Sequence, residues 1–511
     1  MGGKVYLVGA GPGDTGLLTL KGKAALERAD AVVYDFLANE DLLRYALPHC
    51  EKICVGKRPG HKNSSQEEIN QLLVDRAAQG NIVVRLKGGD PFIFGRGGEE
   101  AQVLAKAGIP FEIVPGITSG YAAAAYAGIP LTHRDLSSSV TFVTGHEDPS
   151  KSSSSVDWTS LATATDTLVL FMGVRNLSEI SAALLKGGKE PRTPAAVIFW
   201  GTRAAQQTLT GTLADIAAKA KGVEAPAIIV VGKVAALREE LNWFERLPLF
   251  GKRIVTTRAR GQSAAFRDAL ESLGAESIEI PAIEIRDPHS WQPLDRAIGR
   301  LQEFDYLLFT STNGVAKFLG RLAACGRDVR DLKGLLIGAI GPATAAELAA
   351  TGIRADFLPE EYRAEGLIEC LKGAEVRGKS FLIPRAKVAR DILPRSLEER
   401  GARVEVVEAY ETVQPDLAAG ELERLLSPRP DAITFTSSST LTNFVNLVEN
   451  AGLRKILERL AIASIGPITS QTVRQHGLEV AMEAANSTVD GLIEALQVYF
   501  RQSEKGSSRR P

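Results

Sequence analysis

The stretch Arg85-Leu-Lys-Gly-Gly-Asp-Pro-Phe-Ile-Phe-Gly-Arg-Gly-Gly-Glu-Glu100 decides how the first half of this chain folds. It overlaps an apolar run, Ile82 to Leu86, that is typical of a buried strand. Its five glycines allow a backbone to approach a ligand closely and to adopt positive φ angles, while Lys87, Asp90 and Arg96 supply charge. This composition favours a ligand-binding loop at the end of a strand over an ordinary glycine-rich turn.

The composition of the 511 residues limits the fold and the function. Their number predicts about three or four domains. Sixty Lys and Arg residues nearly balance 61 Asp and Glu residues, so no overall field attracts nucleic acid or an anionic membrane. Four cysteines without CxxC spacing and six scattered histidines indicate neither a disulfide framework nor a metal site. No signal-like or membrane-spanning segment is evident, so we expect a cytoplasmic protein without nucleic-acid or membrane partners.

The chain divides near residue 250. Strand and helix patterns alternate up to Leu241, Asn242 to Gly251 interrupt them, and a new strand begins at Arg253. We therefore expect four segments: a domain over 1–245, a linker over 246–250, a domain over 251–500 and a flexible tail over 501–511. Within the first domain, Ser65-Gln-Glu-Glu68 predicts a capping box that opens a helix, and Gly80 ends that helix.

The second half carries an internal repeat. Three pairs of short motifs recur in one order at nearly constant spacing: Thr257-Arg258 with Pro384-Arg385, Phe309-Thr-Ser311 with Phe435-Thr-Ser437, and Ile340-Gly-Pro-Ala-Thr344 with Ile465-Gly-Pro-Ile-Thr469. Each member lies where an apolar strand meets a helix. The repeat therefore predicts two similar α/β units.

These strand-to-helix junctions indicate an anionic ligand. A helix that begins just after a strand presents unpaired N–H groups and the positive end of its dipole. Hydroxyl groups lie beside them, and the candidates for binding carboxylates are Ser311, Thr344, Ser437 and Thr469. At any single junction N-capping is the commoner use of Ser or Thr, and only the repeated set favours binding.

A second glycine turn lies near the N-terminus, in Val5-Tyr-Leu-Val-Gly-Ala-Gly-Pro-Gly-Asp-Thr15. It lacks the Gly-Lys-Ser/Thr that ends a Walker loop. Asp14 stands where the dinucleotide motif G-x-G-x-x-G requires its third glycine. This turn therefore serves nucleotide phosphates poorly, and Asp14 fits a positively charged or zwitterionic ligand better.

Several motifs, in order, resemble uroporphyrinogen-III C-methyltransferase over about residues 3–245. They are Gly9-Ala-Gly-Pro-Gly-Asp14, Val32-Val-Tyr-Asp35, Val55-Gly-Lys-Arg58, Arg85 to Glu100, Val114-Pro-Gly-Ile-Thr118, Gly128-Ile-Pro-Leu-Thr-His-Arg-Asp135 and Thr144-Gly-His146. The remainder, from 251 to about 500, resembles uroporphyrinogen-III synthase through the repeated motifs and Val406-Val-Glu-Ala-Tyr-Glu-Thr-Val413. The resemblance implies an α/β protein with a two-lobed tetrapyrrole methyltransferase fold, followed by two interleaved flavodoxin-like lobes of about 251–283 plus 415–500 and about 286–410.

The resemblance also implies a bifunctional enzyme of tetrapyrrole biosynthesis, leading toward sirohaem or cobalamin. Its second half would close hydroxymethylbilane to uroporphyrinogen III with loss of water and inversion of the last ring. Its first half would methylate that product twice with S-adenosylmethionine, giving precorrin-2. Asp35 matches the family's proton acceptor and Lys57 its proton donor, and Tyr410 is the candidate donor to the departing hydroxyl.

The family's contacts with the methyl donor fall on Pro12, Gly88, Gly89, Asp90, Ile93, Thr118, Ser119, Met172 and Gly201. Candidate anchors for the tetrapyrrole carboxylates are Arg58, Arg96, His133 and Arg134. The first glycine-rich loop would then divide its tasks, with Gly88 to Asp90 meeting the methyl donor and Arg96 the tetrapyrrole. We expect tetrapyrroles as the partners, a homodimer formed through the methyltransferase half, and no metal.

Alternatives stay open. An NAD-dependent oxidoreductase would explain the glycine turn near the N-terminus, although Asp14 argues against it. A non-catalytic tetrapyrrole-binding module would explain the second half. Asp35, Lys57 and Tyr410 also have structural explanations as a polar strand end, a surface charge and a half-buried strand tyrosine. No stretch resembles the NAD-binding domain of some related fusions, so we expect neither dehydrogenase nor ferrochelatase activity.

Overall fold

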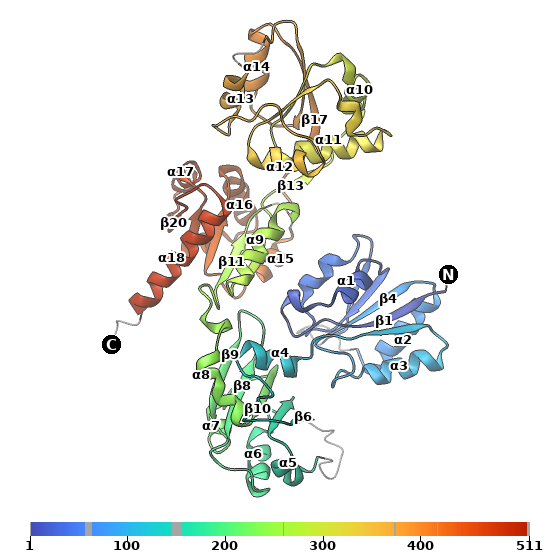
Figure 1. The fold of residues 1–511 in the computed structure, drawn as a ribbon, viewed down its shortest axis with the longest axis vertical. Coiled ribbons are helices and arrows are strands. Elements are labelled where there is room, and N and C mark those ends of the chain that lie inside the picture. Colours follow the sequence, from blue (N-terminus) through green and yellow to red (C-terminus); the bar gives the residue numbers. More distant parts are fainter. Residues whose placement is uncertain are drawn as a thin grey trace. The chain divides into compact units, whose positions relative to one another are not determined.

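The computed structural model describes residues 2–56, 64–145, 156–258, 260–371, 375–415 and 417–507. Strands and helices alternate along most of the chain (Figure 1). The strands form four five-stranded sheets. The chain divides into two compact units. The first comprises the chain up to Arg253, with 269–276 and the last helix from Phe500, and the second comprises the remainder.

The first sheet of the first unit is parallel, in the order β3-β2-β4-β1-β5. Its strands are β1 (Lys4–Gly9), β2 (Ala31–Tyr34), β3 (Glu51–Cys54), β4 (Ile82–Lys87) and β5 (Phe111–Val114). Helix α1 (Leu20–Leu26) packs on one face, and α2 (Gln66–Ala78) and α3 (Gly97–Lys106) pack on the other. Because the strands are parallel, their carboxyl ends lie at one edge, where open α/β sheets bind ligands.

Helix α2 begins and ends as its sequence predicts. The Ser65 hydroxyl accepts the Glu68 amide proton and the Glu68 carboxylate accepts that of Ser65, which completes the capping box. Ile69, Leu73 and Ala77 are buried against the sheet. Gly80 follows the helix with a φ of 90°, a left-handed conformation that favours glycine.

The second lobe of the first unit has a mixed sheet in the order β6-β7-β10-β8-β9. Its strands are β6 (Val140–Thr144), β7 (Thr167–Phe171), β8 (Pro194–Phe199), β9 (Gln207–Thr212) and β10 (Ala227–Val231). Its helices are α4 (Ser119–Tyr126), α5 (Trp158–Ala164), α6 (Leu177–Lys186), α7 (Ile216–Lys219) and α8 (Arg238–Leu241). The predicted linker does not run free, because Leu249 is buried and the ring centroid of Phe250 lies 5.2 Å from that of Phe244.

The second unit contains two lobes that share the chain unevenly. One sheet, in the order β12-β11-β18-β19-β20, consists of β11 (Arg253–Thr256), β12 (Glu276–Glu279), β18 (Ala432–Phe435), β19 (Ala461–Ser464) and β20 (Met482–Glu483). The other, in the order β13-β17-β16-β14-β15, consists of β13 (Glu284–Arg286), β14 (Tyr306–Phe309), β15 (Leu336–Ala339), β16 (Ser380–Ala386) and β17 (Arg403–Val413).

Ten helices flank these strands along the described chain. Those of the discontinuous lobe are α9 (Arg260–Ser272), α15 (Ala419–Leu425), α16 (Ser438–Asn450), α17 (Pro467–Gln475) and α18 (Val489–Ser507). Those of the continuous lobe are α10 (Gln292–Gly299), α11 (Thr312–Ala324), α12 (Pro342–Ala350), α13 (Ala364–Cys370) and α14 (Ile392–Glu399). Helix α18 continues to Ser507 where a flexible tail from 501 was expected, and Arg501 and Gln502 are good helix formers.

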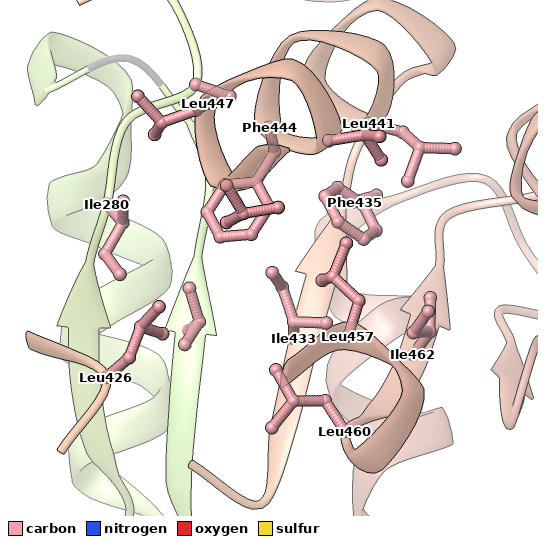
Figure 2. Packing of buried hydrophobic residues seen from close by; sticks show 14 of the residues in the cluster. Ile280, Leu426, Ile433, Phe435, Leu441, Phe444, Leu447, Leu457, Leu460 and Ile462 are labelled. Carbon is pink, nitrogen blue, oxygen red and sulfur yellow. The ribbon is translucent and has the colours of Figure 1, made fainter. Parts of the chain in front are cut away.

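The core of the discontinuous lobe joins the two ends of the second half. Ile280, which follows β12, packs in one cluster with Leu426, Phe444 and Leu447 from the far end of the chain (Figure 2). Numbered along the chain, the strands of this lobe lie in the order 2-1-3-4-5, which is the flavodoxin order. The interleaved flavodoxin-like arrangement that the resemblance implies is therefore confirmed.

The internal repeat corresponds to equivalent places in the two sheets. Strands β14 and β15 are parallel neighbours followed by α11 and α12, as β18 and β19 are followed by α16 and α17. The looser third pair also agrees, because β16 pairs in parallel with β14 as β11 does with β18. The prediction of two similar α/β units is confirmed.

Candidate functional site

A cavity of about 500 Å³ lies in the first unit, where the carboxyl edge of the parallel sheet meets the second lobe. Loops after β1, β2, β4 and β5 form one wall, and segments after β7 and β8, with the start of β10, form the other. This volume is within the range of small-molecule sites, roughly 300–1,000 Å³.

The cavity brings together the whole set of residues predicted to contact a methyl donor. All nine line it: Pro12, Gly88, Gly89, Asp90, Ile93, Thr118, Ser119, Met172 and Gly201. The first seven follow the parallel strands, and the last two belong to the second lobe. Ala123, from the alanine-rich part of α4, also lines the cavity, and a Cβ on Gly201 would lie 2.5 Å from its Cβ. Small residues are thus needed where α4 meets the turn after β8.

Glycines let three loops meet at backbone distance. A Cβ on Gly116 would lie 2.3 Å from the carbonyl oxygen of Gly89, and one on Gly9 would lie 2.5 Å from the Cα of Gly116. Any larger residue would force the loops after β1, β4 and β5 apart. The close approach at these positions is therefore between backbone segments, of which Gly89 lines the cavity.

Strained backbone is concentrated around the cavity. Among the described residues, five non-glycine residues have positive φ angles: Phe94, Arg96, Met172, Trp200 and Thr202. Three of them line the cavity, Thr202 lies between two lining residues, and Arg96 follows lining residue Gly95. Such conformations persist where the surrounding structure imposes them and are typical of ligand sites.

Asp90 shapes its own loop. Its Oδ1 accepts the backbone N–H of Phe92 at 2.8 Å, and its Oδ2 accepts that of Gly116 at 2.9 Å. The carboxylate therefore ties the loop after β4 to the loop after β5.

Asp14 does not line the cavity, although its position in the N-terminal glycine turn was interpreted as suited to a positively charged or zwitterionic ligand. Its Oδ1 accepts the N–H of Gly16 at 2.7 Å, and its Oδ2 accepts the hydroxyl proton of Tyr126 at 2.5 Å. The N–H of Asp14 donates to the Thr202 hydroxyl at 3.1 Å. Burial, and then the contact with Asp14, raise the pKa of the Tyr126 phenol. The aspartate caps a short turn and joins the lobes because both of its oxygens find protein donors.

Asp35 belongs to a buried network of charges. Nη2 of Arg85 donates to its Oδ1 at 2.6 Å, and Nε of Arg85 donates to Oε1 of Glu100 at 3.1 Å. Nζ of Lys87 donates to the same Glu100 oxygen at 2.8 Å. Burial, and then the charge of Arg85, lower the pKa of Lys87. Asp35 itself is not part of the cavity wall but directly precedes Phe36 and Leu37, which are.

The sequence interpretation missed Arg85 and Glu100 as site residues. The side chains of both are almost wholly buried. One signal was present: Arg85 is a charge inside the apolar run of β4, and a buried charge requires a partner.

Of the predicted tetrapyrrole anchors, the three that the structure describes, Arg96, His133 and Arg134, do not line the cavity. Arg96 is exposed and pairs with Glu99, with 2.6 Å between Nη2 and Oε2. Arg134 is exposed, and Nδ1 of His133 accepts the N–H of Asp135. Lys57 and Arg58 lie outside the described residues.

In the second unit, the candidate serines both act as N-caps. Ser311 accepts the N–H of Gly314 and lies 2.9 Å from the hydroxyl of Tyr410, and Ser437 accepts the N–H of Thr440. N-capping, the alternative to ligand binding, thus holds for both serines, and Ser311 also contacts Tyr410.

Thr344 and Thr469 are only 4 % exposed, so in this state their hydroxyls have little access to a ligand. Arg258, at the end of β11, was noted only as part of the repeat. The described structure gives its guanidinium no hydrogen bond or ion pair, and burial lowers its pKa.

Among the described residues there is neither a cluster of metal ligands nor a helix that could span a membrane. No group of three or more His, Cys, Asp or Glu side chains there could hold a metal ion. Within the same ranges, no helix combines the length and apolarity needed to cross a membrane.

Comparison with known families assigns both halves. Residues 4–217 match the model of tetrapyrrole (corrin/porphyrin) methylases, and residues 264–494 match that of uroporphyrinogen-III synthase HemD. A porphyrin biosynthesis protein HemD from Ruminiclostridium josui is 38% identical over 506 residues, covering 97% of each chain. A uroporphyrinogen-III C-methyltransferase from Bacillus subtilis is 39% identical over 84% of this chain and 90% of its own.

Among solved structures, a uroporphyrin-III C-methyltransferase from Thermus thermophilus complexed with S-adenyl homocysteine is similar to part of this chain. It is 40% identical, covers 46% of this chain and 100% of its own, and has a TM-score of 0.41. The two family models, and a relative that matches along nearly the full length, agree with the division of the fold. The chain therefore belongs to the family of bifunctional tetrapyrrole biosynthesis enzymes in which a tetrapyrrole methylase is fused to a uroporphyrinogen-III synthase.

Proposed function

We propose that the first unit binds S-adenosylmethionine in its cavity and methylates uroporphyrinogen III, which the second unit produces from hydroxymethylbilane. The observation that carries this proposal is the convergence of all nine methyl-donor positions on one cavity. The enzyme is bifunctional, with uroporphyrinogen-III synthase and S-adenosylmethionine-dependent uroporphyrinogen-III C-methyltransferase activities. We assign two successive methylations, with precorrin-2 as the product.

The residues present fit this cofactor. Apolar side chains such as Phe36, Ile93 and Trp200 offer walls for an adenosine and a thioether, and the neighbouring glycine loops offer backbone groups. Neither glycine turn supplies a phosphate-binding motif. When bound, S-adenosylmethionine supplies an electrophilic methyl group to a pyrrole carbon.

The chain's own contribution to methylation is positioning and proton transfer. The cavity fixes the donor relative to the acceptor carbon, which lowers the entropic cost of the reaction. We assign removal of the pyrrole proton to Asp35, with Lys57 as proton donor. The salt bridge to Arg85 supports this role, because it fixes the Asp35 carboxylate one residue before the cavity wall. Arg58, Arg96, His133 and Arg134 remain the proposed anchors for the substrate carboxylates.

In the second unit, Tyr410 is the proposed hydrogen-bond donor to the departing hydroxyl of the bilane. Its own hydroxyl lies beside Ser311 at the start of α11, where N–H groups and the helix dipole favour an anionic substrate. Ser437 and the unpartnered Arg258 are further candidate carboxylate contacts among the described residues. The burial of Thr344 and Thr469 makes them the weakest members of the predicted set.

We also propose that the protein acts in the cytoplasm as a homodimer formed through the methyltransferase half. Its four cysteines are all free, which fits a reducing compartment. Large apolar side chains of the first unit, such as Leu20 and Phe92, are exposed and would be covered by a second copy. Sedimentation of the full chain tests the dimer, and a concentration-independent monomer would contradict it.

The decisive experiment supplies hydroxymethylbilane and S-adenosylmethionine with a labelled methyl group to the intact protein. The expected product is a dimethylated type III tetrapyrrole. Binding of NAD without binding of S-adenosylmethionine would instead support an oxidoreductase. Accumulation of the type I isomer, with normal methylation of supplied uroporphyrinogen III, would reduce the second unit to a binding module.

A further inference from the structure

Two arginines line the cavity, and the described structure gives neither guanidinium a hydrogen bond or ion pair: Arg175, which is exposed, and Arg203, which is partly buried. The guanidinium of Arg203 stacks on the indole of Trp200, 5.1 Å from the ring centroid. Burial lowers the pKa of Arg203, and the charge of Asp41 opposes that effect.

The fold holds this arginine in place. A Cβ on Gly13 would lie 2.7 Å from Nε of Arg203 and 2.9 Å from its Cγ, so the space that the side chain occupies depends on that glycine. The N–H of Arg203 donates to the carbonyl of Trp200 at 3.2 Å, and its own carbonyl accepts the N–H of Gln206 at 2.8 Å. Because an unpaired, partly buried cation is costly, a guanidinium stacked on an indole in a cavity wall indicates an anionic group of a ligand.

We propose that Arg203 receives the α-carboxylate of the methyl donor, an inference that rests on the function proposed above. S-adenosylmethionine carries a sulfonium, an ammonium and a single carboxylate, and a guanidinium binds a carboxylate with two parallel hydrogen bonds. The other source of the same chemistry is a carboxylate of the tetrapyrrole. The cofactor is favoured because a cavity of about 500 Å³ suits a molecule of its size better than a macrocycle with eight acidic arms.

The test compares two ligands that differ only in this carboxylate. Titration calorimetry on the full chain measures S-adenosylmethionine and its decarboxylated analogue against wild type, Arg203→Gln and Arg203→Lys. Arg203→Gln should weaken the affinity for S-adenosylmethionine by about 10- to 100-fold and change the affinity for the decarboxylated analogue by less than about twofold. Arg203→Lys keeps the positive charge but lacks the planar guanidinium fork. Its affinity for S-adenosylmethionine should therefore lie between those of wild type and Arg203→Gln. Arg192→Gln, which removes an exposed arginine that does not line the cavity, should match wild type.

Each other outcome contradicts the proposal in a different way. An equal loss of affinity for both ligands would mean that Arg203 only maintains the shape of the cavity. Thermal unfolding of Arg203→Gln would then show a lower stability than wild type. Unchanged affinity for S-adenosylmethionine with a raised KM for uroporphyrinogen III would assign the carboxylate to the tetrapyrrole. If wild type bound no S-adenosylmethionine, the proposed function itself would fail, whereas equal tight binding by all variants would overturn only the role of Arg203.

Discussion

The hydroxyl of Tyr126 donates a 2.5 Å hydrogen bond to the carboxylate of Asp14, and the two residues belong to different lobes of the first unit. Asp14 follows the loop that contributes Gly11 and Pro12 to the cavity, and Tyr126 ends helix α4, whose Ser119 and Ala123 line the same cavity. One hydrogen bond thus ties the loop after β1 to helix α4, and both contribute residues to the cavity.

Tyr126→Phe should loosen both the unit and the site. A hydrogen bond to a charged group contributes about 1.5–3 kcal/mol, so we expect a loss of that size in the free energy of unfolding and a severalfold weaker affinity for S-adenosylmethionine. Denaturation followed by tryptophan fluorescence measures the first, since three of the four tryptophans, Trp158, Trp200 and Trp243, lie in this unit. Tyr121→Phe on the same helix, where the phenol is 55 % exposed, is the control.

The same bond predicts a pH dependence. In the folded protein the pKa of the Tyr126 phenol is raised above that of the unfolded chain, whose tyrosines titrate at about pH 10. The stability advantage of wild type over Tyr126→Phe should therefore be complete below pH 10 and decline above it. Unfolding curves of both proteins from about pH 8 to about pH 11, a range that spans the ordinary pKa of tyrosine, measure this difference. A difference that grows with pH would contradict the assignment.

Glu100→Gln should be among the most destabilising single changes in the first unit. It removes the negative charge that faces both Arg85 and Lys87 in a site that excludes water. Breaking such a buried pair costs about 3–5 kcal/mol. Glu99→Gln is the matched control: its partner Arg96 and Glu99 itself are both more than half exposed, so it should cost at most about 1 kcal/mol. Similar losses in the two variants would show that the network contributes little.

Arg96→Ala should separate the two ligands of the methyltransferase. Arg96 is exposed and does not line the cavity, so the affinity for S-adenosylmethionine should stay within about twofold of wild type. Loss of one contact to a carboxylate should raise the KM for uroporphyrinogen III on the order of tenfold. Steady-state kinetics and titration calorimetry give both values. The reverse pattern would undo the division of the loop into donor and acceptor parts.

Tyr410→Phe should slow ring closure on the order of tenfold, because it removes one hydrogen-bond donor near the departing hydroxyl. Product analysis after reaction with hydroxymethylbilane should show more of the type I isomer, which forms without the enzyme's control of the last ring. Methylation of supplied uroporphyrinogen III by the same variant is an internal control and should not change. A full rate with Tyr410→Phe would leave the tyrosine as a structural partner of Ser311.

Local signals in the sequence were sufficient for much of the fold. The capping box at Ser65 and the glycine at 80 bound α2, and the repeated motifs correspond to equivalent strands, because short-range hydrogen bonding and chain direction determine these features. The nine cavity positions came from the family resemblance, and most of them are loop residues whose role depends on backbone shape.

Contacts between distant residues could not be predicted. Asp14 pairs with Tyr126, 112 positions away, so its use as a structural link depends on how the lobes meet. No pattern of charges in the sequence around Arg203, which follows β8 and its turn, marks it as a binding residue. Only the folded cavity shows that its guanidinium has no partner in the described structure. Thr344 and Thr469 repeat in sequence as ligand-binding hydroxyls would, yet helix packing buries them.

The interleaved second unit also constrains how the chain can fold during its synthesis on the ribosome. Thr257, at the end of β11, donates its hydroxyl proton to the carbonyl of Thr434, 177 positions away, and β11 pairs with β18. At translation rates of about 5–20 residues per second, the early strand waits roughly 10 to 35 s for its neighbour. The lobe from β13 to β17 is complete before that neighbour emerges. The nascent chain therefore carries a finished lobe beside an unpaired β-strand edge, and this interval is when a chaperone would matter most.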